Sequence, residues 1–351
     1  MAKRAYKYRF YPTPEQVVLL AQTFGCVRFV YNSVLRWRSD AYRQRQEKVG
    51  YAGASARLTQ LKRDPELAFL ADVSCVPLQQ CLRHQQTAFK NFFEGRAQYP
   101  AFKRKRGHQS AEFTRSAFSY REGQLYLAKS KTRLDIRWSR ELPCAPSTVT
   151  VSMDPAGRYF VSCLCEFEPA SLPIRTSVIG IDLGLILFGR GAGGEARAKA
   201  RLKVARLHAK ISDCRQDNLH KLSRRLINDN QVICVESLKV KNMIRNPTLS
   251  KAIADAGWGE LVRQLGYKAD WAGRSLVSID QWFPSSKRCS DCGHTLTTLP
   301  LSVRQWRCPA CGVDHDRDHN AAVNIKAAGL AVLALGESVS GMESVSVSCS
   351  H

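Results

Sequence analysis

Acidic residues are scarce in this chain relative to basic ones. Its 351 residues include 30 Asp and Glu against 53 Lys and Arg, which gives a formal net charge of +23 and a pI near 9.7. The basic excess runs along the whole chain and is not confined to a tail. Solubility alone is served as well by a balanced or acidic surface, so this imbalance favours a polyanionic partner, and nucleic acid fits best.

Long apolar runs and a disulfide pattern are also missing. No stretch approaches the roughly eighteen uncharged apolar residues of a membrane span, and the N-terminus lacks the apolar core of a signal peptide. Thirteen cysteines are present, but those outside the C-terminal cluster stand singly or within apolar strands, as do Cys163, Cys165 and Cys234. We therefore expect a soluble intracellular protein in a reducing cytoplasm, with no membrane partner.

Four cysteines near the C-terminus have the spacing of a zinc site. They form two C-x-x-C pairs separated by fifteen residues: Cys289, Cys292, Cys308 and Cys311. Zn²⁺ prefers tetrahedral soft ligands, and each pair can supply two thiolates from one turn of a β-ribbon. Four unlinked thiols or two disulfides are the alternatives. Since all four ligand positions are filled, we predict one structural zinc.

The first half of the chain predicts a helical region beside a β-rich one. Lys3–Tyr11 alternates like a strand, and Thr13, Pro14 and Gln16 form the start signal of a helix. Two helical runs follow, which we expect to break near Gly25. Further predicted elements are a helix at Leu78–Phe93 and short strands at Leu125–Leu127, Leu134–Trp138, Val149–Met153 and Tyr159–Phe167.

After a predicted linker at Pro169–Pro173 the pattern changes to α/β. Buried strands and helices alternate, and the strands precede acidic residues. The predicted elements are strands at Val178–Ile181, Gln231–Val235 and Ser275–Ile279 and helices at Ala196–Leu226, Ile253–Trp271 and Asn320–Leu335. We find no internal repeats, and the sequence predicts a multidomain α+β protein.

Three carboxylates follow this α/β pattern. Asp182 and Glu236 each end a buried strand, and the carboxyl edge of parallel strands is where such sheets bind ligands. Asp318 precedes the last helix. Together they suggest a site for Mg²⁺, with two ions able to polarise a phosphodiester. Individually each acid could instead cap a helix or lie in solvent.

Residues for nucleic-acid contact are harder to choose. The run Lys103, Arg104, Lys105 and Arg106 is densely basic, and aromatic residues lie near it. A charge run is usually a solvated face, but interleaved aromatics favour backbone contact. The other candidates are Tyr6, Arg9, Arg28 and Asn32, for which a role as ordinary solvated residues is the alternative.

The order of these motifs resembles one known family. Gly180-Ile-Asp182-Leu-Gly184, Val232-Ile-Cys-Val-Glu236, the two cysteine pairs and Asp316-Arg-Asp318-His-Asn320-Ala-Ala-x-Asn324 are similar to the TnpB (OrfB-type) proteins of bacterial insertion sequences, which are related to type V CRISPR effectors. The N-terminal segments Tyr6–Gln16 and Phe24–Asn32 resemble that family's helix-turn-helix region.

The resemblance implies a domain plan. It implies a wedge-like β-barrel from residues 1–10 and 110–170, a helical recognition lobe at 11–109, a RuvC-like (RNase H-fold) nuclease domain at 171–284 and 314–335, an inserted zinc ribbon at 285–313 and a flexible tail at 336–351. Position by position, Asp182, Glu236 and Asp318 match the family's catalytic carboxylates.

It also implies an activity and partners. The expected function is RNA-guided cleavage of double-stranded DNA, with a guide RNA from the element's end and two Mg²⁺ ions, by a cytoplasmic, nucleoid-associated bacterial protein whose choice between monomer and dimer the sequence leaves open. One departure matters: about forty residues that the family has between Asp182-Leu-Gly184 and the long helix are missing, and with them two strands of a five-stranded sheet.

Two other functions stay open. The shortened region suggests, as the first alternative, an RNA-guided binding protein that no longer cuts DNA, acting as a repressor or a decayed copy. The second is a transposase that joins DNA ends itself. No nucleophilic tyrosine beside paired histidines supports that reading, although an acidic triad is compatible with it.

Overall fold

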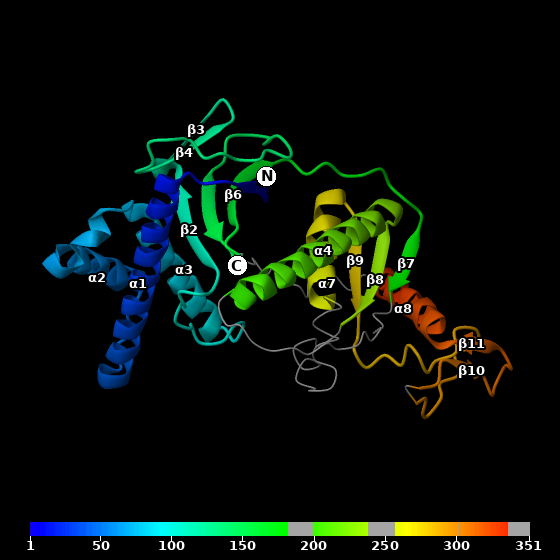
Figure 1. The fold of residues 1–351 in the computed structure, drawn as a ribbon. Helices are drawn as coiled ribbons and strands as arrows, with labels where there is room; N and C mark the ends of the chain where they lie inside the picture. The colour runs from blue at the N-terminus through cyan, green and yellow to red at the C-terminus, as the bar shows by residue number, and fades with distance from the viewer. Residues whose placement is uncertain (182–198, 238–256, 301, 336–351) are drawn as a thin grey trace. The chain divides into compact units, whose positions relative to one another are not determined.

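The computed structural model of the chain describes residues 1–181, 199–237, 257–300 and 302–335 (Figure 1). Two compact units account for these residues. The first is Met1–Glu168, with which the start of helix α4 up to Arg206 also groups, and the second begins at Pro169. The boundary coincides with the start of the predicted linker.

The first unit combines helices and antiparallel strands around one hydrophobic core. Its predicted helical lobe and β-rich segment share that core, because buried residues of both belong to it. The elements are β1 (Ala2–Phe10), α1 (Pro14–Arg45), α2 (Tyr51–Arg63), the 3₁₀ helix η1 (Pro65–Ala71), α3 (Cys75–Phe93), β2 (Gln109–Thr114), the 3₁₀ turn η2 (Arg115–Ala117), β3 (Phe118–Arg121), β4 (Gln124–Leu127), β5 (Thr148–Met153) and β6 (Tyr159–Phe167).

Helix α1 begins where the sequence predicts and runs further than expected. The Gln16 backbone N–H donates to Thr13 Oγ1 (3.3 Å) and the Thr13 N–H to Gln16 Oε1 (3.1 Å), so the capping box is confirmed. The predicted break near Gly25 is wrong, since α1 is continuous. A glycine costs a helix about 1 kcal/mol, and the burial of neighbours such as Phe24 and Val27 outweighs that cost.

The strands of this unit form an open sheet. Their order is β1-β6-β5-β2 and all neighbours are antiparallel, while β3 and β4 form a separate hairpin. The predicted strand at Leu134–Trp138 is reduced to one bridge between Phe10 and Ile136. Within the described residues no ladder joins the edge strands β1 and β2, so the closed barrel that we expected is replaced by an open sheet and a hairpin.

Helix α1 also bears on the expectation about membranes. Among the described helices it is long and apolar enough to cross a membrane by length and composition, with a mean hydropathy of 1.3 in its most apolar window. This window was not expected from the sequence, and the one charged residue within it is Arg28. The apolar face of α1 is buried in the first unit's core through residues such as Leu20, Val30 and Leu35, so packing against this core accounts for its apolar character.

The second unit contains a parallel sheet between helices. Its elements are β7 (Val178–Ile181), α4 (Lys199–Asp229), β8 (Val232–Glu236), α7 (Trp258–Ala272), β9 (Ser275–Ile279), β10 (Gln305–Arg307), β11 (Asp314–Asp316) and α8 (Arg317–Ala334). Three strands pair in parallel in the order β7-β8-β9. This is the α/β pattern that the sequence predicts, and the three carboxyl ends meet at one edge.

Alternate residues of β8 face different helices. Ile233 and Val235 pack with α4 and α7 in one cluster, whereas Cys234 packs against α8. The helices therefore cover both faces of the sheet (Figure 1). Since side chains alternate along a strand, Glu236 shares the face of Cys234 and points to the side of α8.

Helix α8 lies close against the sheet at a glycine. A Cβ on Gly180 of β7 would meet the carbonyl oxygen of Ala322 and the backbone nitrogen of Lys326, the latter at 2.8 Å. Backbone atoms cannot turn aside as a side chain can. We therefore expect Gly180→Ala to destabilise the second unit by about 1–3 kcal/mol or more, seen as a lower midpoint of thermal unfolding.

Gly266→Ala provides the matched control. Gly266 lies within α7, and the nearest atom to its added Cβ is Leu276 Cδ2 at 3.9 Å, an ordinary contact. Because alanine favours a helix by about 1 kcal/mol over glycine, this variant should be neutral or more stable. Equal midpoints for the two variants would contradict the close approach of α8.

Several predicted features fall outside the described residues. Asp182, the glycine-rich segment after it, and the tail at 336–351 are among them. Elsewhere the boundaries shift by a few residues: the predicted helix at Asn320–Leu335 spans Arg317–Ala334, and the one at Leu78–Phe93 begins at Cys75.

Candidate functional site

The two cysteine pairs form knuckles of the same design. In the first, the Cys289 N–H donates to His294 O (2.7 Å) and the Gly293 N–H to Cys289 O (3.0 Å). In the second, the Cys308 N–H donates to Val313 O and the Gly312 N–H to Cys308 O, both at 2.9 Å. The glycines have φ values of 77° and 76°, a region that favours glycine. Each knuckle thus holds its two thiols on one side of a turn.

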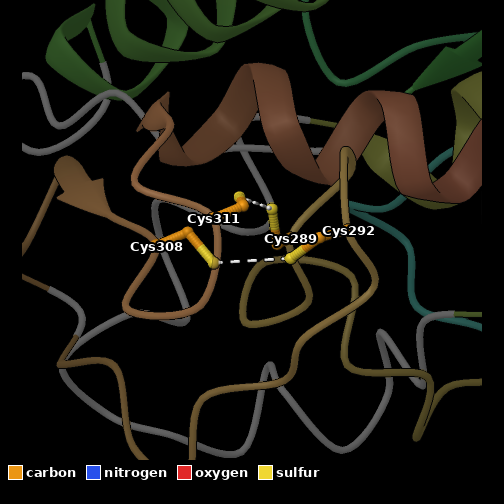
Figure 2. Close-up of side chains that lie close together, drawn as sticks. All are labelled: Cys289, Cys292, Cys308 and Cys311. Atoms are coloured by element: carbon orange, nitrogen blue, oxygen red, sulfur yellow. Dashed lines mark hydrogen bonds between the residues drawn. The ribbon is translucent and has the colours of Figure 1, made fainter.

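The four thiols converge (Figure 2). The sulfurs of Cys289 and Cys311 are 3.7 Å apart, those of Cys292 and Cys308 are 3.6 Å apart, and all four lie within 4.8 Å of one another. A tetrahedron with Zn–S bonds of about 2.3 Å has sulfurs about 3.8 Å apart, whereas a disulfide needs about 2.05 Å. The predicted cysteines are therefore brought together as free thiols, in a geometry that fits zinc.

The thiols of this cluster differ in pKa. Desolvation raises the pKa of Cys308, but backbone N–H groups of Cys311 and Ala310 and neighbouring thiols lower it to about 7. The Val313 N–H lowers the pKa of Cys311, yet desolvation and hydrogen bonds with the other thiols raise it to about 12. Four thiols so close cannot all ionise without a cation, and zinc would displace their protons on binding.

His315 is a fifth polar group at this cluster. Its Nε2 lies 3.0 Å from Cys289 Sγ and 3.7 Å from Asp291 Oδ2, and its ring is 4.7 Å from that of Trp306, its neighbour across the β10–β11 pair. These three groups, Cys289, Asp291 and His315, form a second set that could hold a metal. His315 is not among the residues predicted from the sequence, although its position four residues after Cys311 is a usable signal.

The three predicted carboxylates are only partly described. Glu236 is the half-buried last residue of β8, and its Oε1 accepts from Ser285 Oγ at 2.5 Å. Asp318 lies in the first turn of α8, exposed, with its oxygens 3.3 and 3.4 Å from the Arg304 guanidinium. Asp182 follows Ile181, the last described residue of β7, and lies outside the described part. Their convergence on one metal site stays a prediction.

Two asparagines of the family motif, which were not predicted to be site residues, link these regions. Asn320 and Asn324 are buried on α8 and donate to backbone carbonyls of Ser285 and Arg288, just before the first knuckle. Their spacing of four residues in an alanine-rich helix places them on one face, which is the available signal. The start of α8, the first knuckle and Glu236 are thereby held together.

The basic run is an anchored loop. Asn32 binds the backbone of Lys103 from both sides, accepting from its N–H (2.8 Å) and donating to its carbonyl (3.0 Å). The buried amide of Gln109 donates to the carbonyls of Arg104, Lys105 and Gly107, at 2.9–3.3 Å. With its carbonyls held by these side chains, the loop keeps Arg104, Lys105 and Arg106 exposed. Lys103 is exposed as a residue, but its ammonium group turns toward the Tyr31 ring.

The other candidates for nucleic-acid contact have different places. The guanidinium of Arg28, one turn before Asn32 on α1, donates to Gln109 Oε1 (3.0 Å) and so supports the same loop. The ammonium of Lys103 lies 4.9 Å from the Tyr31 ring centroid, and desolvation lowers its pKa.

Tyr6 and Arg9 lie apart from this loop on β1. Tyr6 is buried, with the Arg140 guanidinium 5.2 Å from its ring centroid, and Arg9 lies over the rings of Phe160 and Tyr11. The structure thus brings Arg28, Asn32 and the basic run together and places these two residues elsewhere.

Family models match three parts of the chain. Residues 1–47 match a "Helix-turn-helix domain" of OrfB proteins, residues 188–247 a "Probable transposase" model of the same family, and residues 258–325 a "Cas12f1-like, TNB domain". The last of these contains both knuckles, Ser285 and the start of α8.

Curated proteins match along almost the whole chain. One from Streptomyces pristinaespiralis, named "Putative RNA-guided DNA endonuclease", is 52% identical over 370 residues that cover 96% of this chain and 92% of the relative. Another, InsQ of Escherichia coli (strain K12), carries the same description and is 30% identical, covering 96% of this chain and 94% of the relative. Because 370 aligned residues exceed the 351 of this chain, the first relative contains segments that this chain lacks.

Solved structures give a weaker match. A chain from a cryo-EM structure of a Cas12f1–sgRNA–target DNA complex covers 93% of this chain and 99% of its own length, with 14% identity and a TM-score of 0.33. The assignment therefore depends on sequence identity over nearly full length, together with the converging thiols and the motif order. On that evidence, this chain belongs to the TnpB (OrfB-type) family.

Proposed function

We propose that the protein is an RNA-guided DNA endonuclease that cleaves phosphodiesters at a site formed by Asp182, Glu236 and Asp318. The relatives' descriptions supply the reaction class. The observation that carries the proposal is the position of Glu236: it ends a parallel strand on the face of α8, and Asp318 lies in the first turn of that helix.

The register of the sheet supports the inclusion of Asp182 in this site. Ile181 of β7 pairs with Val235 of β8, so a strand that continued one residue further would bring Asp182 level with Glu236. Gly180, two residues before Asp182, faces α8, and alternation would give Asp182 the same face. In this proposal the sheet and α8 belong to a RuvC-like domain, and the sheet of the first unit has the role of the family's wedge.

The donor set suits Mg²⁺. Carboxylate oxygens are its preferred protein ligands, and bound Mg²⁺ supplies charge stabilisation and an activated water for phosphodiester hydrolysis. The chain's own part is to hold three acids at fixed positions. Glu236 already accepts a hydrogen bond from Ser285. Asp318 forms an exposed ion pair with Arg304, and because such pairs are weak, a metal cation could replace the guanidinium as the partner of this carboxylate.

The same proposal assigns the exposed basic loop to the nucleic acid. Within the described residues, Arg104, Lys105 and Arg106 have no acidic partner, and the Gln109 amide donates to the backbone carbonyls of Arg104 and Lys105. Basic side chains on an already ordered loop lose little conformational entropy when they bind phosphates. The RNA and DNA partners named for Cas12f1 and for the curated relatives are proposed for this chain too. The affinity of the protein for these nucleic acids should fall as the salt concentration rises.

Neutralising this loop should weaken binding. In a variant with Arg104→Gln, Lys105→Gln and Arg106→Gln, we expect about 10- to 100-fold lower affinity for RNA at moderate salt. The dependence of log Kd on log salt should become shallower, by roughly 0.7–0.9 for each phosphate that the variant no longer binds. Fluorescence anisotropy over a salt series measures both quantities.

A control variant removes three charges elsewhere. Lys48, Lys62 and Arg63 are exposed residues of the same unit, and their replacement by glutamine lowers the net charge equally. This variant should lose much less affinity. If the two triple variants weaken binding alike, general charge and not the loop determines affinity.

One experiment tests the function itself. RNA that co-purifies with the protein is sequenced, and a plasmid library carrying its complement beside random flanking sequence is incubated with the complex and Mg²⁺. Cleavage of matched plasmids, abolished by EDTA, supports the proposal. Sequence-matched binding without nicking would instead favour the cleavage-deficient alternative, and random ribosomal fragments would argue against RNA guidance altogether.

A further inference from the structure

Ser285 lies at the junction of three segments of the second unit. It is 7% exposed, and it lies between β9 and the first knuckle. Its hydroxyl donates to Glu236 Oε1, a residue 49 positions earlier in the chain. In the described part of the chain, the other carboxylate oxygen of Glu236 has no hydrogen-bond partner.

The backbone of Ser285 is held by two side chains of α8. Its carbonyl accepts from Asn324 Nδ2 (2.8 Å) and Asn320 Nδ2 (3.4 Å). Both amides also donate to Arg288 O, at 2.6 and 2.8 Å, and Asn320 Oδ1 accepts from the Ser290 N–H at 3.0 Å. Asn320 is 1% exposed and Asn324 is 5% exposed, so water does not compete for these hydrogen bonds.

This arrangement fixes the position of the Ser285 hydroxyl. A carboxylate at a strand end otherwise rotates about its side-chain bonds, and each rotamer presents different oxygens to the site. One charged hydrogen bond to Oε1 favours one rotamer, and within the described residues Oε2 accepts no hydrogen bond. The helix that supplies Asn320 and Asn324 also carries Asp318, so the same contacts set the separation of both acids.

We infer that Ser285 is a positioning residue: it orients Glu236 for a divalent cation, and α8 holds Ser285 in place through Asn320 and Asn324. The inference depends on the proposed function, because it assumes that Glu236 binds a cation. Groups that orient metal ligands change metal affinity by about 10- to 100-fold when they are removed.

The test measures binding of Mn²⁺, added alone as the probe, to the full-length zinc-loaded protein freed of RNA. Electron paramagnetic resonance of free Mn²⁺ gives the affinity. We expect Ser285→Ala to weaken the tightest Mn²⁺ site about 10- to 100-fold, whereas zinc content, thermal unfolding and RNA affinity stay as in the unmodified protein. Ser285→Thr, which keeps the hydroxyl, should restore much of the affinity.

The neighbouring serine provides the control. Ser286 is partly buried, and within the described residues its hydroxyl makes no hydrogen bond, so Ser286→Ala should bind Mn²⁺ normally. Should Ser285→Ala melt early or lose zinc, Asn324→Ala gives a second measure. It removes one donor to the Ser285 carbonyl without adding a charge, while Asn320 still donates to that carbonyl, and it should also weaken Mn²⁺ binding.

Glu236→Gln separates the inference from the function on which it depends. If Glu236→Gln weakens Mn²⁺ binding and Ser285→Ala does not, the positioning role is wrong and the site stands. If neither variant changes Mn²⁺ binding, Glu236 is not a ligand and the proposed site itself fails. A parallel loss in both variants supports the inference.

Discussion

Glu236→Gln is expected to abolish DNA cleavage and to leave the binding of RNA and target DNA unchanged. Glutamine has nearly the same shape, and its amide oxygen can still accept from Ser285 Oγ, so the fold around β8 should persist. What the side chain loses is its negative charge, which a hard cation requires. We expect the rate of plasmid cleavage to fall by at least about a thousandfold, or about 4 kcal/mol in activation free energy.

Asp318→Asn should have a similar effect for the same reason. Its ion pair with Arg304 is exposed, and such pairs contribute about 0–1 kcal/mol, so stability should barely change. Asp270→Asn is the control, since Asp270 is an exposed carboxylate on α7 and loses the same charge. Cleavage by Glu236→Gln at the unmodified protein's rate would exclude Glu236 from the chemistry.

The features that the sequence predicted well are short-range. The capping box at the start of α1 needs residues three apart, and each zinc knuckle needs a C-x-x-C with a following glycine. The strand at Tyr159–Phe167 has its predicted bounds because its alternation reflects one buried face. In these cases the physical cause lies within a few residues of its effect.

The features that it missed depend on contacts between distant residues. Arg28 supports Gln109 across 81 positions, and Ser285 meets Glu236 across 49. Neither glutamine nor serine carries a local signal for such a role. The continuity of α1 through Gly25 has the same origin, because burial against the rest of the first unit decides it, and helix propensity at one position does not.

Loss of one zinc ligand is expected to unfold the ribbon and to remove the metal. The buried core there consists of Cys289, Trp306 and Cys308, with a few partly buried side chains beside it. So small a core cannot stabilise two knuckles alone, whereas structural zinc contributes apparent binding free energies of about 10–16 kcal/mol. In Cys308→Ser, the zinc content measured by mass spectrometry should fall from about one per chain toward zero.

Unfolding of the zinc ribbon should also disturb the proposed active site. Cys289 follows directly on Arg288, whose carbonyl α8 holds through Asn320 and Asn324, so an unfolded knuckle would loosen the segment that carries Ser285. We therefore expect Cys308→Ser to gain protease cleavage between β9 and α8 and to lose DNA cleavage. Cys214→Ser, at an exposed thiol of α4, should do neither. Retention of zinc and protease resistance by Cys308→Ser would contradict the four-thiolate site, because a hydroxyl cannot replace the thiolate that completes it.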